Sequence, residues 1–298
     1  MSLTPAQVQE FRDNGVLIAK NVLTEADLAP LIADTNDFID RKAKELQAQG
    51  KIKDLAEGQP FETRIARLFE QSPEIVQGID IMQHRGKRTF EFLHNKNLLD
   101  AVEKLIGSEI TCSPIQHLRA KVPSTCGNGK YELVGWHQDL SVTWEEADVS
   151  DIVTCWIPLV DATVERGCME VMPGLSKFGY IEHGMDTCIK PELVQQDKAI
   201  PAICPRGGIV FMSKLCPHRG LPNVSDVVRW TIDLRYQVTG TPTGRPFYPD
   251  FPVRTKRSDV KLISHEEWCA RWLKGMEDAK NEIWHRPKKQ AAMAAAKM

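Results

Sequence analysis

No two of the eight cysteines are separated by exactly two residues, and their scattered positions fit neither a disulfide framework nor a zinc-ribbon spacing. We therefore expect reduced thiols and a cytoplasmic protein. The amino-terminal residues contain no basic stretch followed by an apolar run, so no secretory signal is expected. No window approaches 18 consecutive apolar residues, and the sequence therefore predicts no membrane-spanning helix.

An excess of charge of one sign is also missing. The chain has 38 Lys and Arg against 40 Asp and Glu, and its formal net charge is −2. This balance gives no reason to expect nucleic acid or a membrane surface as a partner, and no feature indicates an oligomeric state. A short basic group near the end is expected to lie in a solvated tail; it consists of Arg286, Lys288, Lys289 and Lys297.

Helix signals dominate the first third of the chain. Thr4 and Gln7 form a capping box, and Gly15 ends the helix that they begin. A second helix is predicted from Thr24, whereas residues 54–72 show only a weak pattern. Further helical segments are predicted from Ser72-Pro73, after a cap at Asn97, and over 264–284.

After residue 107 the pattern changes to short apolar or alternating runs, separated by Gly, Pro, Asn and Asp. Because no amphipathic helices come between these runs, an antiparallel sandwich or barrel is favoured over a βαβ sheet. The weakly patterned residues 174–205 are expected to form a loop over the mouth of the fold. The runs lie at 109–122, 132–139, 152–160, 168–172, 208–215 and 229–238.

A His-x-Asp pair, His137 and Asp139, falls within one predicted strand. Alternate residues of a strand project to the same face, so the two side chains can converge on one point. His265 and Glu267 have the same spacing, but they stand at a predicted helix start, where residues two apart diverge by about 200°.

A third candidate ligand, His218, follows an apolar run and opens a turn. Two histidines and one carboxylate, with three positions left open, form the facial triad that suits non-haem Fe(II) and O₂ chemistry. Taken alone, His218 is more often an ordinary turn histidine than a metal ligand.

Arg229 lies eleven residues after His218 and begins a run in which polar and apolar residues alternate. If the polar face looks outward, this is an ordinary surface strand. If it looks into a barrel, Arg229 offers a planar, permanently charged fork to a carboxylate. Arg235, on the same face, is expected to pair with Asp233 or another acid.

As an ordered set, these motifs resemble the phytanoyl-CoA dioxygenase family. Members are Fe(II)- and 2-oxoglutarate-dependent oxygenases with a double-stranded β-helix (jelly-roll, cupin-like) core. The resemblance thus implies a mainly β fold with flanking helices. The motifs are Trp136-His137-Gln138-Asp139, Thr154-Cys155-Trp156-Ile157-Pro158-Leu159, Gly167-Cys168-Met169-Glu170-Val171-Met172-Pro173-Gly174, His218 and Arg229.

The resemblance also implies an activity. We expect a single dioxygenase domain over 1–298, with a helical N-terminal region over 1–107, a jelly-roll core over 108–258 and a helical tail over 259–298. Using Fe(II), 2-oxoglutarate and O₂, such a protein hydroxylates a C–H bond of a small-molecule substrate, its expected partner, and releases succinate and CO₂.

Carried over position by position, the resemblance implies that His137, Asp139 and His218 bind iron and that Arg229 binds the distal carboxylate of 2-oxoglutarate. Residues expected around the co-substrate are Trp156, Gln116, Lys121 and Thr231; Trp156 is equally consistent with core packing. The substrate pocket is expected to be lined by residues 54–70 and 174–205. The individual side chains expected to contact the substrate are Trp144, Arg119, Arg64 and His183.

Two positions depart from the family pattern. Where Pro-Gly-Ser-His-Lys is common, the chain has Pro173-Gly174-Leu175-Ser176-Lys177. Where a Ser or Thr two residues after the distal histidine often contacts 2-oxoglutarate, it has Gly220, so Thr231 or Thr154 would have to supply that hydroxyl.

Three readings of function stay open at this point. The complete ligand set favours an enzyme over a non-catalytic module of the same fold. A cupin-type metal protein that uses no 2-oxo acid is the third reading. The carboxylate of Asp139 argues against halogenation, whereas desaturation, cyclisation and epimerisation use the same ligands.

Overall fold

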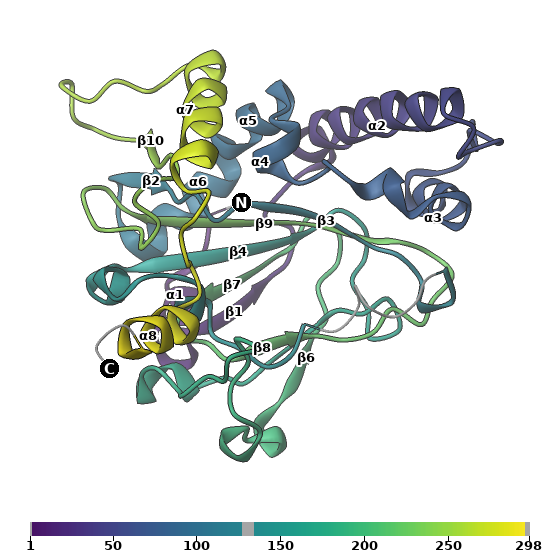
Figure 1. The fold of residues 1–298 in the computed structure, drawn as a ribbon. Coiled ribbons are helices and arrows are strands. Elements are labelled where there is room, and N and C mark those ends of the chain that lie inside the picture. Colours follow the sequence, from purple (N-terminus) through teal and green to yellow (C-terminus); the bar gives the residue numbers. More distant parts are fainter. Residues whose placement is uncertain (1, 127–133, 296–298) are drawn as a thin grey trace.

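The computed structural model describes residues 2–126 and 134–295, which form two antiparallel sheets with helices around them (Figure 1). The larger sheet has seven strands in the order β1-β7-β4-β9-β2-β10, with β3 also beside β9. Its strands are β1 (Val16–Ala19), β2 (Ile110–Cys112), β3 (His117–Lys121), β4 (Ile152–Pro158), β7 (Ile209–Ser213), β9 (Arg229–Val238) and β10 (Phe251–Arg254). The smaller sheet has the order β6-β5-β8, with β5 (Met169–Val171), β6 (Ile200–Ala202) and β8 (His218–Gly220).

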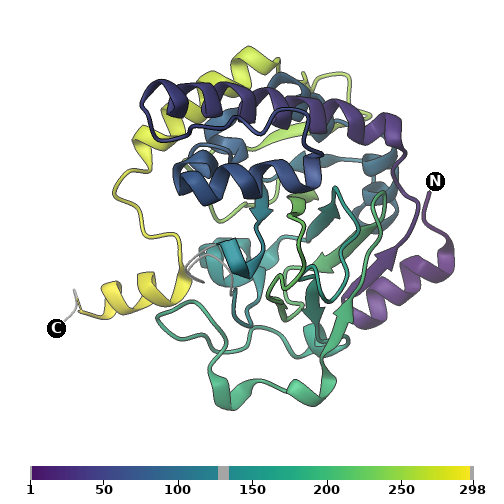
Figure 2. The same cartoon turned by 90° about the vertical axis from the view of Figure 1, so that its right-hand side faces the viewer.

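Most helices cover one face of the larger sheet, and the smaller sheet lies on its other side (Figures 1 and 2). The second helix predicted from Thr24 forms as α2 and packs in this layer, where its Leu28 and Leu31 are fully buried. The expected mainly β fold with flanking helices is thereby confirmed. The helices are α1 (Pro5–Asn14), α2 (Glu25–Ala48), α3 (Phe61–Gln71), α4 (Ile81–His84), α5 (Lys87–Leu93), α6 (Lys96–Ile106), α7 (His265–Asp278) and α8 (Arg286–Ala295).

Strand β9 organises the interior. It pairs with β4 along one side, and with β3 and β2 end to end along the other. Its apolar residues join the core beneath the helices; these are Trp230, Ile232, Leu234 and Tyr236. Its alternate polar residues face the opposite way and are also buried; these are Arg229, Thr231, Asp233 and Arg235. The polar face of this strand therefore looks into the fold, which excludes the surface-strand reading.

Several element boundaries differ from the sequence expectations. Helix α3 forms in the weakly patterned stretch, and α6 begins after Asn95, whose side chain accepts from the Leu98 amide. Asn97, the expected cap, instead donates to the carboxylate of Asp27. Residues 132 and 133 of the expected strand 132–139 lie outside the described residues, and only His137 of the remainder makes a β-bridge.

The helix expected over 264–284 is shorter in the structure, and a further helix, α8, begins beyond that range. Helix α7 ends at Asp278, and an extended segment then passes the edge of the larger sheet to α8 on its other side (Figures 1 and 2). Trp268 and Trp272 of α7 are fully buried in the core. Within the described residues, no helix is long and apolar enough to cross a bilayer.

Residues 279–295, here called the C-terminal strap, correct the expectation of a solvated tail at Arg286; Lys288 is exposed as expected, and Lys297 lies outside the described residues. Arg286 is only 3% exposed, because its guanidinium donates to the Asp148 carboxylate and to the carbonyls of Thr143 and Trp144. Trp144 stacks on Trp284 of the strap, with ring centroids 5.3 Å apart. The strap is therefore fixed to the segment that follows Asp139.

Arg286→Ala is expected to lower the free energy of unfolding by about 1–3 kcal/mol, because two backbone carbonyls lose their buried donor. Urea unfolding measures this loss. Lys288→Ala, an exposed neighbour in the same helix, is the matched control and should leave stability within about 0.5 kcal/mol. Equal effects of the two substitutions would contradict the role given to Arg286.

Candidate metal centre

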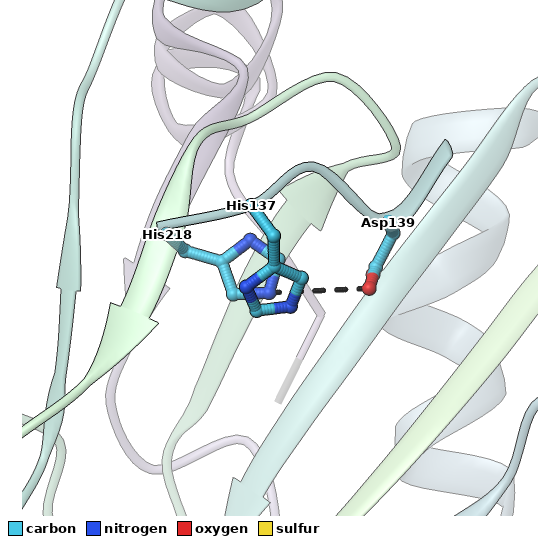
Figure 3. Close-up of side chains that lie close together, drawn as sticks. All are labelled: His137, Asp139 and His218. Atoms are coloured by element: carbon cyan, nitrogen blue, oxygen red, sulfur yellow. Dashed lines mark ion pairs between the residues drawn. The ribbon is translucent and has the colours of Figure 1, made fainter. Parts of the chain in front are cut away.

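Three side chains meet where the two sheets face each other. The ligand atoms of His137, Asp139 and His218 all lie within 4.8 Å of one another (Figure 3). His218 Nε2 lies 3.9 Å from Asp139 Oδ1, and the two imidazole centroids are 4.1 Å apart. The three residues predicted as ligands are thus brought together.

The backbone accounts for this convergence. His137 and His218 form an isolated antiparallel bridge, with each amide donating to the other's carbonyl at 2.9 Å. Asp139 begins a short 3-10 helix (Asp139–Val142) and is not in a strand. Gln138 between them is nevertheless extended, with φ −114° and ψ 139°, so residues 137 and 139 still project the same way.

Hydrogen bonds orient both imidazoles. Nδ1 of His137 lies 2.9 Å from the Gly135 carbonyl, and Nδ1 of His218 lies 3.0 Å from the Cys216 carbonyl. Because a carbonyl only accepts, each Nδ1 carries a proton, and Nε2 is the ring nitrogen left to bind a metal. Burial, together with the neighbouring His218, lowers the pKa of His137 to about 3. At neutral pH this imidazole is therefore neutral and able to bind a metal.

Asp139 is held by two residues of neighbouring strands. Arg235 donates to Oδ1 from Nη2 at 2.8 Å and to Oδ2 from Nε at 3.2 Å, and the Thr154 hydroxyl donates to Oδ2. Thr154 and Arg235 stand directly opposite each other on β4 and β9. Burial alone would raise the pKa of Asp139, but Arg235 and His218 hold it far below its usual value. The acid that pairs with Arg235 is therefore not Asp233, the partner named from the sequence, but the candidate metal ligand Asp139.

Arg229 is a buried cation in the same interior. It is 6% exposed, donates to the Thr231 hydroxyl from Nη1 at 2.8 Å, and lies 5.3 Å from the Trp156 ring. Burial lowers its pKa to about 10, and Asp233 partly offsets this effect. Among the described residues no carboxylate forms an ion pair with Arg229, so its guanidinium suits an anionic ligand.

A cavity of about 350 Å³ joins these groups. Its polar lining includes the two histidines, four cationic side chains, Thr154 and Asp233. Much of its apolar lining, here called the apolar wall, comes from α3, the turn that follows it and β3. The histidines and cations are His137, His218, Arg119, Lys121, Arg229 and Arg235, and the apolar wall includes Phe69, Val76, Ile79, Leu118 and Val122.

The residues expected near the co-substrate take different positions. Trp156 and Lys121 line the cavity, and Trp156 also packs in a buried apolar cluster. Thr231 is fully buried and contacts Arg229. Gln116 donates to the Ser113 carbonyl and to Cys112 Sγ, and it does not belong to the described cavity wall.

Of the four residues expected at the substrate pocket, only Arg119 lines the cavity. Arg64 forms an ion pair with Asp40 at 2.5 Å, and the ring of Trp144 stacks on Trp284 of the C-terminal strap. His183 accepts from the Gln138 amide at 3.1 Å, behind the metal-binding segment. The side chains of Arg64, Trp144 and His183 are held by these contacts and do not belong to the described wall of the cavity.

The segment 174–205 also differs from expectation. Its described residues contribute nothing to the cavity wall. Leu175 and Ile189 pack instead in a small cluster with Trp136, and Ile181 donates its amide to the side chain of Gln138. This segment therefore supports the metal-binding residues from outside. The apolar wall, apart from Phe69, was missed by sequence reasoning because its residues read as ordinary core.

The donor set fits Fe(II). Two imidazoles with free Nε2 atoms and one carboxylate leave three coordination positions open, which matches the facial triad of non-haem iron oxygenases. The nearby Arg229 fits the second, anionic ligand that such chemistry requires. The residues present therefore fit both iron and a 2-oxo acid.

Comparison with known proteins adds to this picture. Among curated proteins, the methylphosphonate hydroxylase of Gimesia maris is 31% identical over 84 residues, which are 28% of this chain and 32% of that protein. The match thus spans about a third of that relative.

Two solved structures share the fold. The non-heme monooxygenase ThoJ, in its apo form, superposes with a TM-score of 0.62 at 17% identity, covering 98% of this chain and 100% of that one. The epimerase SnoN, in complex with Fe³⁺, alpha ketoglutarate and nogalamycin RO, gives 0.55 at 17% identity, covering 87% and 92%. These likenesses confirm the jelly-roll, cupin-like architecture.

The family comparison covers most of the chain. The profile described as phytanoyl-CoA dioxygenase (PhyH) matches residues 11–231, a span that begins in α1 and includes His137, Asp139, His218 and Arg229. The chain therefore belongs to the phytanoyl-CoA dioxygenase family.

Proposed function

We propose that this protein is an Fe(II)- and 2-oxoglutarate-dependent dioxygenase that hydroxylates a C–H bond of a small-molecule substrate. Succinate and CO₂ are the other products. The observation that carries the proposal is one cavity lined by both histidines of the triad and by the buried guanidinium of Arg229. We also propose that residues 1–298 act as a single catalytic domain.

Each residue has a role in this proposal. His137 and His218 hold the metal through Nε2, and Asp139 holds it through its carboxylate. The metal, when bound, supplies the oxidising chemistry with O₂ and the 2-oxo acid. Arg229 binds the distal carboxylate of 2-oxoglutarate, and Trp156 packs beside that guanidinium. The apolar wall limits access of water to the reacting groups.

The cavity favours a small substrate that carries an anionic group. Its volume of about 350 Å³ must also hold the co-substrate. Arg119 lines it with a side chain that is 51% exposed, although its Nε pairs with Asp233 at 3.2 Å. Because one relative bears the name methylphosphonate hydroxylase, short alkylphosphonates are the first compounds to test. Succinate release stimulated by a candidate compound is the readout.

Arg229→Ala separates this proposal from a cupin-type metal protein that uses no 2-oxo acid. We expect the KM for 2-oxoglutarate to rise about 30-fold or more, because a buried carboxylate loses its charged partner. Metal content should stay unchanged. Arg257→Ala, an exposed arginine paired with Asp259, is the matched control.

A variant that keeps the wild-type KM would contradict the role of Arg229. Absence of bound iron and of any 2-oxoglutarate consumption in the anaerobically purified wild type would favour a non-catalytic module instead.

A further inference from the structure

His183 is a buried histidine whose two ring nitrogens are both hydrogen-bonded. It is 5% exposed and does not line the described cavity. Its Nε2 lies 3.1 Å from the amide nitrogen of Gln138, and its Nδ1 lies 2.6 Å from the Ile181 carbonyl oxygen. A backbone amide only donates and a carbonyl only accepts. Nδ1 therefore carries the proton, and Nε2 offers its lone pair to Gln138.

This hydrogen bond reaches the peptide group that joins His137 to Gln138. The carbonyl of that group accepts from the His218 amide at 2.9 Å, and its N–H donates to His183. Because a peptide group is planar, holding its two polar ends fixes its rotation. The rotation of this group in turn sets the directions in which the side chains of His137 and Asp139 project. His183 thus holds one end of the group on which the convergence of these ligands depends.

The side chain of Gln138 is anchored to backbone groups. Gln138 is fully buried; its Nε2 donates to the carbonyls of Gly179 and Leu215, and its Oε1 accepts from the Ile181 amide. Among the described residues, His183 is the one side chain that hydrogen-bonds to Gln138. A buried N–H without an acceptor is unfavourable, so loss of the His183 acceptor would favour other rotations of the peptide group.

Neighbouring contacts fix the imidazole of His183 in place. The Tyr180 ring stacks on it, with ring centroids 4.8 Å apart and an angle of 15° between the planes. The guanidinium of Arg286, from the C-terminal strap, lies 5.1 Å from the Tyr180 ring. His183 also forms an isolated β-bridge with Ile189, whose amide donates to the Trp136 carbonyl at 2.7 Å. The imidazole is therefore held at a set position behind the metal-binding segment.

We propose, on the basis of the function proposed above, that His183 is a positioning residue for the metal centre. By accepting from the Gln138 amide, it holds the preceding peptide group in the rotation that lets His137 and Asp139 bind one ion. His183 acts through this hydrogen bond alone. The role replaces the substrate contact that was expected for His183 from the sequence.

Two substitutions separate the roles of the two ring nitrogens. His183→Gln places an oxygen near the position of Nε2 and keeps an acceptor for Gln138. His183→Asn places an amide nitrogen near the position of Nδ1 and keeps only the donor to Ile181. Ni(II) is titrated calorimetrically into each metal-free full-length protein. His183→Asn should weaken binding about tenfold or more, because loss of a group that orients metal ligands costs about 10- to 100-fold in affinity. His183→Gln should bind within about threefold of wild type.

His94→Asn is the matched control. Nδ1 of His94 also lies close to a carbonyl, that of Phe90 at 3.1 Å, and its ring packs against Phe90 and Phe251. This variant should keep the wild-type affinity for Ni(II), whatever its loss of stability in urea. Far-UV circular dichroism confirms that each titrated variant is folded. If His183→Asn does not fold, His183→Phe takes its place, because it keeps an aromatic ring beside Tyr180 without either nitrogen.

A spectroscopic readout separates positioning from a general loss of stability. The visible absorption bands of bound Co(II) depend on the arrangement of its ligands. These bands should change in His183→Asn at saturating Co(II), and they should match wild type in His183→Gln and His94→Asn.

Three results would overturn the assignment. They are Ni(II) binding by His183→Asn within twofold of wild type, equal weakening by His183→Gln and His183→Asn, and Co(II) bands of His183→Asn identical to those of wild type. In each case, Ni(II) binding by the wild type would still support the metal centre of the proposed function. Failure of the wild type to bind Ni(II) would overturn both proposals.

Discussion

Alanine in place of His218 is expected to abolish 2-oxoglutarate turnover and to weaken metal binding at least about 100-fold. Loss of supporting contacts around a metal ligand already costs about 10- to 100-fold in affinity, and this substitution removes the ligand itself. Anaerobic titration with Ni(II), followed by a succinate assay with Fe(II), measures both effects.

His265→Ala is the matched control for that experiment. His265 and Glu267 repeat the spacing of His137 and Asp139, but His265 is the first residue of α7. His265 Nε2 lies 2.8 Å from the Arg85 carbonyl, so this control tests a histidine that is likewise hydrogen-bonded. Its metal affinity should equal that of wild type. Undiminished turnover by His218→Ala would contradict the proposed metal centre.

Methionine in place of Arg235 is expected to lower the free energy of unfolding of the metal-free protein by about 3–5 kcal/mol. The reason is that Asp139 would remain buried without its bidentate cation. A bound divalent metal supplies positive charge at the same carboxylate, so saturating Ni(II) should restore much of the lost stability. Urea unfolding with and without Ni(II) measures the two quantities.

A double-mutant cycle tests whether the ion pair is responsible. In an Asp139→Asn background, Arg235→Met should cost much less, because no buried negative charge is left unpaired. Arg235→Lys should fall between wild type and methionine, since lysine keeps the charge but loses the bidentate geometry. An equal cost of Arg235→Met in both backgrounds would show that packing, and not the pair, explains the loss.

Sequence periodicity predicted the central region of the fold. The alternation along residues 229–238 is strong, because one face of β9 packs against the helices and the other lines a polar interior. The three candidate ligands and Arg229 were found by combining their order along the chain with residue chemistry. The extended conformation of Gln138 made that reasoning hold even without a strand at Asp139.

Other features depend on contacts that no local pattern encodes. Arg235 had several possible acidic partners, and its ion pair with Asp139 depends on how the 3-10 helix that begins at Asp139 packs against β4 and β9. Arg64 looked available for a substrate, but the packing of α3 against α2 directs it to Asp40. The position of Lys121 beside Gly220 likewise depends on the packing of β3 against β8, two strands of different sheets.

The position of the C-terminal strap at the end of the described chain bears on when the metal centre can bind its ion during protein synthesis. Arg286 binds the backbone directly after the 3-10 helix that begins at Asp139, and α8 contacts that helix. All three ligands precede the strap in the chain, and a nascent polypeptide leaves the ribosome amino end first. The ligands therefore emerge before the helix that braces them, and acquisition of a tightly held ion is expected to follow translation of residue 295.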